Sequence, residues 1–187
     1  MTKERPILFS APMVRALLDG RKTQTRRAVK PHDLDWMDQH QGMREPCNAE
    51  RCPHGQPSDR LWVREAHYLT DDGHSEYAVY AADDGAAFEH QKRMVGLSAD
   101  FPADVKANHK RLRPSIHMPR WASRIDLEIT AVRVERLQDI TRGDCMAEGC
   151  HFPNLARQTD PKQWYADLWQ SINGPGSWAQ NPLGLCH

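Results

Sequence analysis

RIDLEITAVRVERL, residues 124–137, is the clearest strand signal in this 187-residue sequence. Its apolar side chains from Ile125 to Ala131 share one parity and therefore one face of a strand, whereas Val132 and Val134 fall on the other face. A change of face inside one run predicts a bulge or a sharp bend, as where a strand turns the corner of a small barrel. We therefore expect an α+β fold built on a small, mostly antiparallel β-barrel.

Shorter patterns place the other elements around this strand. Apolar or alternating runs predict strands over residues 7–9, 61–68 and 76–80. Start and stop signals predict three short helices, which run from Ser10 to Gly20, from Thr141 to Gly149 and from Asp160 to Gly174. Trp164, Leu168 and Ile172 form one apolar row of the last helix, and its tryptophans Trp164 and Trp169 are expected to lie on its core face. Two polar stretches, about 31–59 and 83–114, are expected to be loop insertions in a single domain of residues 1–187.

The charge balance and the hydropathy exclude several classes of protein. Twenty-five basic side chains match twenty-five acidic ones, which argues against a nucleic-acid binder held by bulk charge and against an acidic tail. A membrane span needs about 18 apolar residues in succession, and no window of the sequence approaches that length. Residues 1–6 lack the apolar centre of a signal peptide. We therefore expect a cytoplasmic protein without a membrane partner.

The five cysteines predict thiols or metal ligands and no disulfide framework. Cys47, Cys52 and His54 place three soft ligands within a short stretch, and Cys145 and Cys150 could add more. Structural zinc commonly uses closer cysteine pairs, and no fourth ligand is obvious. We favour loop cysteines without a metal, with a metal at Cys47, Cys52 and His54 as the alternative.

The strongest functional signal is the stretch of residues 21–30, which carries five cations and no acid. Arginine and threonine donate hydrogen bonds to phosphate and carboxylate oxygens, although a solvated strand face is the plainer interpretation. A lysine acts as a base only if burial and neighbouring cations lower its pKa, and Arg26 and Arg27 lie close to Lys22 in the sequence. Lys22 and Thr25 could then form a lysine–hydroxyl pair, provided that a turn brings them to one side.

Two glutamates and two tryptophans add to the candidates. Glu65 lies in a predicted strand, and Glu148 lies at the end of a predicted helix, where its charge opposes the helix dipole. Such local misfits are typical of functional positions, although either residue could be an ordinary exposed glutamate. Trp62 and Trp121 flank predicted strands and could stack on a base, with packing in the core as the alternative.

Several blocks of the sequence resemble one family. Residues 20–27, Gly-Arg-Lys-Thr-Gln-Thr-Arg-Arg, resemble the signature of ASCH domains, which are small β-barrels of the PUA-like superfamily. Residues 55–65 resemble the second block of the family, a turn that feeds a barrel strand, with Ser58 where many relatives have glycine. Residues 115–124 and 173–182 resemble a branch common in phages and prophages. The two polar stretches are additions to the minimal ASCH fold.

The resemblance implies a chemistry. ASCH and PUA-like domains are generally associated with RNA or modified nucleobases, and one branch consists of amidohydrolases that remove the acetyl group from the exocyclic amine of N(4)-acetylcytidine. Their catalytic lysine, threonine and glutamate match Lys22, Thr25 and Glu148. The resemblance therefore implies an amidohydrolase of N(4)-acylcytidines that needs no cofactor and takes a small nucleoside as its partner. The residues expected to contact the substrate are Arg26, Arg27, Trp62 and Glu65.

Two other functions stay open at this point. The same site could bind RNA or a modified nucleobase without turnover, or the chain could be a ribonuclease, an activity associated with some ASCH proteins. The neutral net charge favours a small nucleoside over a long RNA strand. The sequence carries no signal for an oligomeric state.

Overall fold

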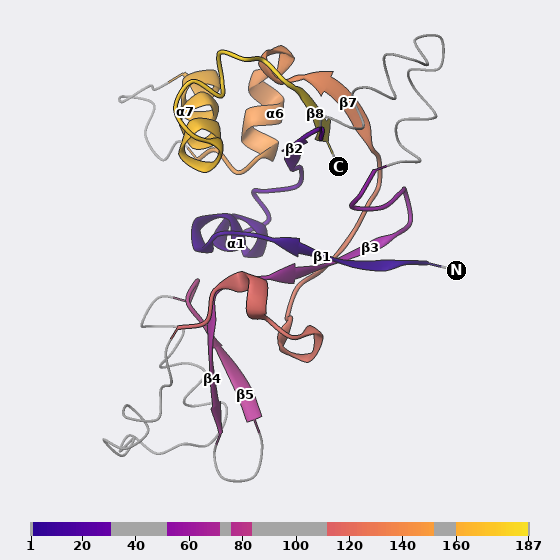
Figure 1. Cartoon of the computed structure of the whole chain (residues 1–187), viewed down its shortest axis with the longest axis vertical. Coiled ribbons are helices and arrows are strands. Elements are labelled where there is room, and N and C mark those ends of the chain that lie inside the picture. Colours follow the sequence, from indigo (N-terminus) through magenta and orange to yellow (C-terminus); the bar gives the residue numbers. More distant parts are fainter. Residues whose placement is uncertain (1, 31–51, 72–75, 84–111, 152–159, 187) are drawn as a thin grey trace. The chain divides into compact units, whose positions relative to one another are not determined.

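The computed structural model describes residues 2–30, 52–71, 76–83, 112–151 and 160–186 (Figure 1). In these residues the chain is α+β, as predicted, with short strands in three small sheets and few helices. Most of both predicted insertions, residues 31–51 and 84–111, lies outside the described residues. The chain divides into two compact units, of which the first comprises Met1–Glu4, Ala16–Arg60 and Glu128–His187 and the second comprises Arg5–Arg15 and Leu61–Leu127.

The first unit is built on a three-stranded sheet of order β2-β8-β7. Its strands are β2 (Arg26–Ala28), β8 (Leu183–Cys186) and β7 (Arg133–Arg136). The central strand β8 pairs antiparallel with both neighbours, so that Leu185 lies opposite Arg27 on one side and opposite Val134 on the other. The cationic stretch of residues 21–30 therefore includes the strand β2.

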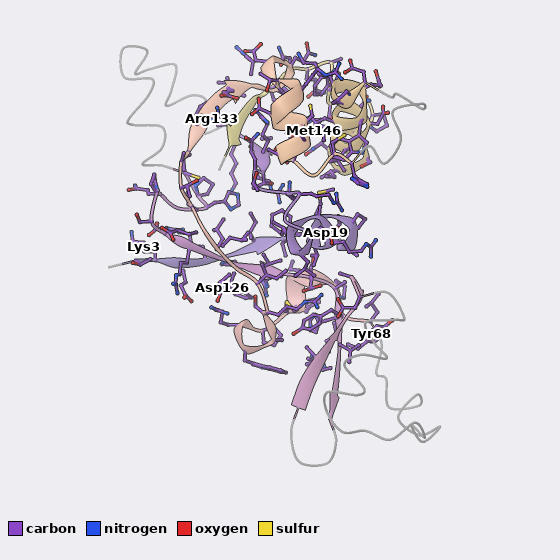
Figure 2. All side chains as sticks on the ribbon, turned by 180° about the vertical axis from the view of Figure 1, so that it is seen from behind. Lys3, Asp19, Tyr68, Asp126, Arg133 and Met146 are labelled. Carbon is purple, nitrogen blue, oxygen red and sulfur yellow. The ribbon has the colours of Figure 1, made fainter. Side chains whose placement is uncertain are left out.

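Two helices and a 3-10 turn enclose a hydrophobic core of the first unit. These elements are η3 (Leu137–Asp139), α6 (Arg142–Ala147) and α7 (Pro161–Asn173). The helices α6 and α7 pack against each other, and side chains crowd the space around them (Figure 2). The buried members of this core are Leu137, Ile140, Cys145, Cys150, Tyr165 and Trp169.

The second unit contains most of a sheet of order β1-β3-β6 and a separate hairpin. The sheet consists of β1 (Glu4–Leu8), β3 (Arg60–Arg64) and β6 (Asp126–Glu128). The hairpin pairs β4 (His67–Asp71) with β5 (Glu76–Tyr80) in antiparallel register, which confirms the predicted strand over residues 76–80. Two 3-10 turns, η1 (Ser115–His117) and η2 (Arg120–Ala122), precede β6.

The predicted change of face in residues 124–137 is a break between two strands. β6 hydrogen-bonds in the sheet β1-β3-β6, whereas β7 belongs to the sheet β2-β8-β7. Between them Ile129 is buried, with 2% of its surface exposed, and its backbone bonds to Asp59 and Ser58 outside any strand. The described strands form three separate sheets and do not close into the predicted barrel, because the chain leaves one sheet before it joins the next.

The predicted starts and ends of the helices are confirmed. α1 (Ala11–Leu18) begins after Ser10, whose carbonyl accepts from the Val14 N–H. α6 begins at a capping box in which Thr141 and Asp144 satisfy each other's backbone N–H groups, and Asp160 caps α7. Of the helices that the structure describes, none combines the length and the apolar character that crossing a membrane requires.

The apolar row predicted for α7 is wrong by about one residue, whereas the predicted place of Trp169 in the core is confirmed. The residues that α7 buries are Pro161, Tyr165, Ala166 and Trp169. Of these, Tyr165 and Trp169 belong to the core described above. Trp164 and Leu168 pack at the edge of the core, and Ile172 is 64% exposed. Successive residues of a helix are rotated by about 100°, so the position of the core partners decides which of two adjacent apolar rows becomes buried.

Candidate active site

The segment from Gly20 to Gln24 bonds to Ala16, in the last turn of α1, and to Ala147, the last residue of α6. The backbone N–H of Lys22 donates to the Ala16 carbonyl at the end of α1, with an N···O distance of 2.9 Å. The N–H groups of Thr23 and Gln24 both donate to the Ala147 carbonyl at the end of α6, at 2.8 and 3.0 Å. This turn brings Lys22 opposite Glu148 as an isolated antiparallel bridge.

Lys22 and Glu148 form a buried ion pair. Lys22 Nζ lies 2.7 Å from Glu148 Oε2, and the two side chains expose only 2% and 4% of their surface. The same ammonium donates to the backbone carbonyls of Gln24, at 2.7 Å, and of Glu148, at 3.1 Å. These acceptors hold the lysine head in one place.

Burial shifts the pKa values of the two partners in opposite directions. Loss of water lowers the pKa of Lys22 despite the opposing attraction of Glu148, and the nearby Arg27 and Arg26 lower it further. Loss of water also raises the pKa of Glu148, against the opposing effects of Lys22, Arg26 and Arg27. Each shift disfavours the charged form of its group, and the two groups lie 2.7 Å apart.

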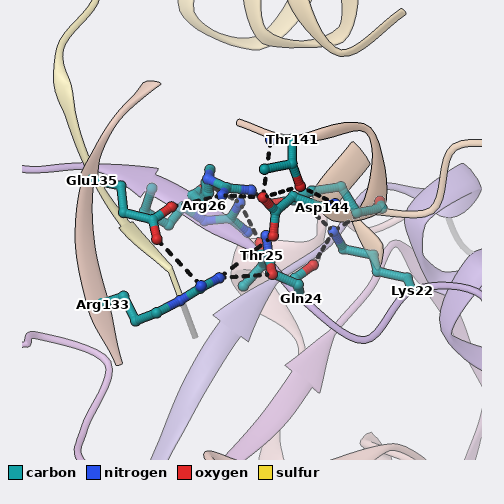
Figure 3. A network of polar contacts seen from close by, with 10 residues as sticks. Lys22, Gln24, Thr25, Arg26, Arg133, Glu135, Thr141 and Asp144 are labelled. Carbon is teal, nitrogen blue, oxygen red and sulfur yellow. Dashed lines mark hydrogen bonds and ion pairs between the residues drawn. The ribbon is translucent and has the colours of Figure 1, made fainter. Parts of the chain in front are cut away.

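Arg26 links Glu148 to two further carboxylates (Figure 3). Its guanidinium Nη2 lies 2.9 Å from Glu135 Oε2 and 3.4 Å from Asp144 Oδ2, and its Nη1 lies 3.8 Å from Glu148 Oε1. The Arg26 side chain is 1% exposed. Arg26 therefore faces carboxylates of β7 and α6, whereas its predicted contact with a substrate stays a prediction.

Thr25 joins the same network through its hydroxyl group (Figure 3). Arg27 Nη1 donates to Thr25 Oγ1 at 3.0 Å, and Thr25 is 5% exposed. Burial lowers the pKa of Arg27, although Glu148 and Tyr165 oppose that shift. Because a hydroxyl that accepts one bond keeps its own proton to donate, this geometry leaves the Thr25 proton for a base.

The structure brings five of the seven predicted site residues into one unit. Trp62 and Glu65 belong to the second unit. There Glu65 is 1% exposed and accepts two bonds from Arg124, at 2.9 and 3.1 Å, while burial raises its pKa against the opposing effect of Arg124. The Trp62 ring is faced by the guanidinium groups of Arg64 and Arg120, at 5.1 and 5.7 Å from its centroid.

The metal alternative gains no support from the described residues. In the ranges that the structure describes, no group of three or more histidine, cysteine or acidic side chains is placed to hold a metal ion. Cys145 and Cys150 lie in the core, where burial raises the pKa of each thiol to about 11. Cys52 is buried, and Cys47 lies outside the described residues.

The sequence patterns do not identify Glu135 and Asp144 as members of this network. Glu135 lies in a predicted strand among alternating charges, and nothing local distinguishes it from a solvent-facing residue. Asp144 forms a capping box with Thr141 at the start of α6, and its second partner, Arg26, is reached only in the folded chain. Residue spacing carried no signal for either contact, because the partner of each is more than 100 positions away.

Replacing Asp144 with asparagine is expected to lower the free energy of unfolding at pH 7 by about 1 kcal/mol, the usual value of a capping interaction. Although burial opposes ionisation, bonds from Thr141 and the nearby Arg26 and Arg133 lower the pKa of Asp144 to about 2. A lowered pKa stabilises the fold above the unfolded value near 3.8, and this stabilisation is lost as the pH falls towards 2. Urea unfolding of both proteins between pH 7 and pH 2 should show the difference shrink, and a difference that stays constant would contradict the assignment.

The first unit thus holds an amine, a hydroxyl, a carboxyl group and two guanidinium groups in one buried polar network. Such a set can transfer protons and can stabilise a developing negative charge. Comparison of the chain with protein-family models, curated proteins and solved structures finds no match.

Proposed function

We propose that this chain is an amidohydrolase that removes acyl groups from the exocyclic amine of cytosine nucleosides, with N(4)-acetylcytidine and related N(4)-acylcytidines as substrates. The observation that supports it most is the buried 2.7 Å contact between Lys22 and Glu148, in which burial favours a neutral amine beside a neutral acid. The residues of this contact, with Thr25, are those that resemble the catalytic set of ASCH-type amidohydrolases. An ASCH-like, PUA-type fold is part of the same proposal.

The proposed reaction uses the base and the acid in turn. The neutral amine of Lys22 takes a proton from the Thr25 hydroxyl, or from a water molecule that this hydroxyl positions, and the resulting oxygen nucleophile attacks the amide carbon. The carbonyl oxygen becomes an oxyanion, which the Arg27 guanidinium stabilises from its place beside Thr25. Protonated Glu148 donates to the leaving exocyclic nitrogen as the carbon–nitrogen bond breaks. Where Thr25 itself attacks, the acyl group is left on its oxygen as an ester, which a water molecule then hydrolyses to free the acid and Thr25. On either route one water molecule is consumed overall, and the products are cytidine and a carboxylic acid.

Wild-type protein incubated with N(4)-acetylcytidine is expected to release cytidine and acetate, separable by chromatography. Thr25→Val, which keeps the shape of the side chain and removes the hydroxyl, should lower the rate about 100-fold or more, whereas Thr25→Ser should keep most of it. Thr130→Val, at an exposed threonine of the same unit, is the matched control and should behave as wild type. Undiminished turnover by Thr25→Val, or no cytidine from the wild type, would contradict the proposal.

One observation supports a second candidate function, a non-catalytic binding module for a modified nucleobase. The Lys22 ammonium has three N–H donors and bonds to three acceptors, at 2.7, 2.7 and 3.1 Å, an arrangement that suits a charged, structural lysine. Under this function the wild type binds N(4)-acetylcytidine in a calorimetric titration and releases no cytidine. The chromatographic assay separates the two functions on the same sample.

A further inference from the structure

We propose that Glu135 of β7 is a positioning residue for the Lys22–Glu148 pair, and that it acts through Arg26. This inference rests on the proposed function, because it assigns Glu135 a part in the same reaction. Glu135 is not expected to touch the substrate or the reacting atoms.

The geometry around Arg26 indicates that Glu135 restrains the Arg26 guanidinium. Arg26 makes its shortest ion pair with Glu135, at 2.9 Å, a longer one with Asp144, at 3.4 Å, and the longest with Glu148, at 3.8 Å. The last distance exceeds that of a hydrogen bond. Glu135 therefore holds the guanidinium on its own side and keeps it from closing on Glu148.

This restraint leaves the two oxygens of Glu148 in different surroundings. Oε2 accepts from Lys22 at 2.7 Å, whereas Oε1 is buried and accepts no hydrogen bond from any described residue. An acid that must give a proton to a leaving group needs one oxygen that is not already bonded to a cation. If Arg26 moved onto Oε1, both oxygens would be tied to cations and the carboxyl group would be held ionised.

The negative charge of Glu135 also affects the pKa values of the Lys22–Glu148 pair. Among the described residues, Lys22, Arg26 and Arg27 act on the charge of Glu148. Arg26 in turn faces Asp144 of α6 and Glu135 of β7, and Glu135 also faces Arg133. Two further titratable groups, Cys145 of α6 and Tyr165 of α7, interact with Glu148 and with Arg27, respectively. Among these groups Glu135 is a carboxylate 28% exposed at its side chain, and it faces both Arg26 and Arg133. Removing its negative charge makes the potential at Lys22 and Glu148 more positive.

The direction of the resulting pKa shifts does not depend on whether Lys22 or Glu148 holds the proton. A more positive potential disfavours protonation, so it lowers the pKa at which the pair gains a second proton and the pKa at which it loses the first. The proposed mechanism works with one proton on the pair and gives a bell-shaped pH profile. Both limbs of the profile of kcat/KM should therefore move to lower pH when Glu135 is neutralised.

The test compares the pH profile of N(4)-acetylcytidine hydrolysis between wild type and Glu135→Gln, which keeps the size and hydrogen-bonding oxygen of the side chain. Both limbs should shift to lower pH by about half a unit to one unit, as expected for one charge removed at this range. Glu135→Asp, which keeps the charge, should show little of this shift and a profile close to that of the wild type. Glu128→Gln removes an exposed carboxylate of β6 and is the matched control, with no shift expected.

A merely structural role of Glu135 would lower the rate at every pH and leave both limbs in place, and that result would overturn the inference. A second measurement separates this failure from failure of the proposed function. The side-chain carboxyl carbon of Glu148, assigned by its loss in Glu148→Gln, can be titrated by NMR in 13C-glutamate-labelled protein without any substrate. If the wild type releases no cytidine, the proposed function fails. The effect of Glu135 on the pair is then tested by the titration alone: a lower Glu148 midpoint in Glu135→Gln supports it, and an unchanged midpoint overturns it.

Discussion

Replacing Lys22 with methionine is expected to lower kcat/KM for N(4)-acetylcytidine about 1000-fold or more, the upper part of the range for loss of a general base. Methionine keeps the length of the buried stem and removes the amine that contacts Glu148 at 2.7 Å. The loss should appear at every pH, because no protonation state restores the missing base. The measurement is the rate of cytidine release, with Lys3→Ala, at an exposed lysine of the same unit, as the control.

The same variant should also be less stable, and the two effects can be separated. Removing one partner of a buried ion pair leaves a carboxylate without its cation, which costs about 3–5 kcal/mol, and uptake of a proton by Glu148, whose pKa burial already raises, offsets part of that cost. In the double variant Lys22→Met with Glu148→Gln no unpaired charge remains, so stability should recover while activity stays lost. Recovery of activity in the double variant, or turnover by Lys22→Met within about tenfold of wild type, would exclude Lys22 as the base.

Replacing Gly149 with alanine is expected to lower the free energy of unfolding by about 2–4 kcal/mol, the sum of a strained backbone and a steric overlap. Gly149 has φ of +101°, a conformation that side chains rarely adopt. An added Cβ would lie 3.0 Å from the Cβ of Ala16 and 3.4 Å from the Cβ of Lys22. The substitution should therefore push the end of α6 away from both Ala16 and Lys22, so the proposed hydrolysis should become slower as well.

Gly143→Ala is the matched control for this prediction. Gly143 lies within α6, just before Gly149 along the chain, and has no positive φ, and an added Cβ would meet Thr141 Oγ1 at an ordinary 3.7 Å. Alanine is favoured over glycine in helices by about 1 kcal/mol, so this variant should be as stable as the wild type or slightly more so. Equal unfolding midpoints for the two alanine variants would show that the tight contact at Gly149 is relieved without cost.

Local interactions explain why much of the secondary structure could be predicted. The capping box of Thr141 and Asp144 joins residues three positions apart, and its partners can be read from the sequence alone. The hairpin of β4 and β5 follows from alternating runs separated by a short polar gap. Closure of a barrel depends on pairing between distant strands, and here the run of residues 124–137 joins two different sheets.

The candidate site shows the same division. Local features of the sequence indicate Lys22 and Glu148 as site residues: Lys22 lies in a cationic stretch, and Glu148 is a carboxylate at the end of a predicted helix. Their 2.7 Å contact joins residues 126 positions apart, and spacing within the sequence carries no signal at that range. Glu135 escaped selection because only the fold turns it towards Arg26.

By itself, the sequence determined the class of the fold, the ends of its helices, most of its strands and the turn after Gly20, because each depends on residues that are neighbours along the chain. Only the tertiary structure decided that Lys22 meets Glu148, that both are almost fully buried, and that Arg26 is shared among three carboxylates. The physical reason is that a pKa depends on the water a group has lost and on the charges around it. Both are set by segments that meet only when the chain folds.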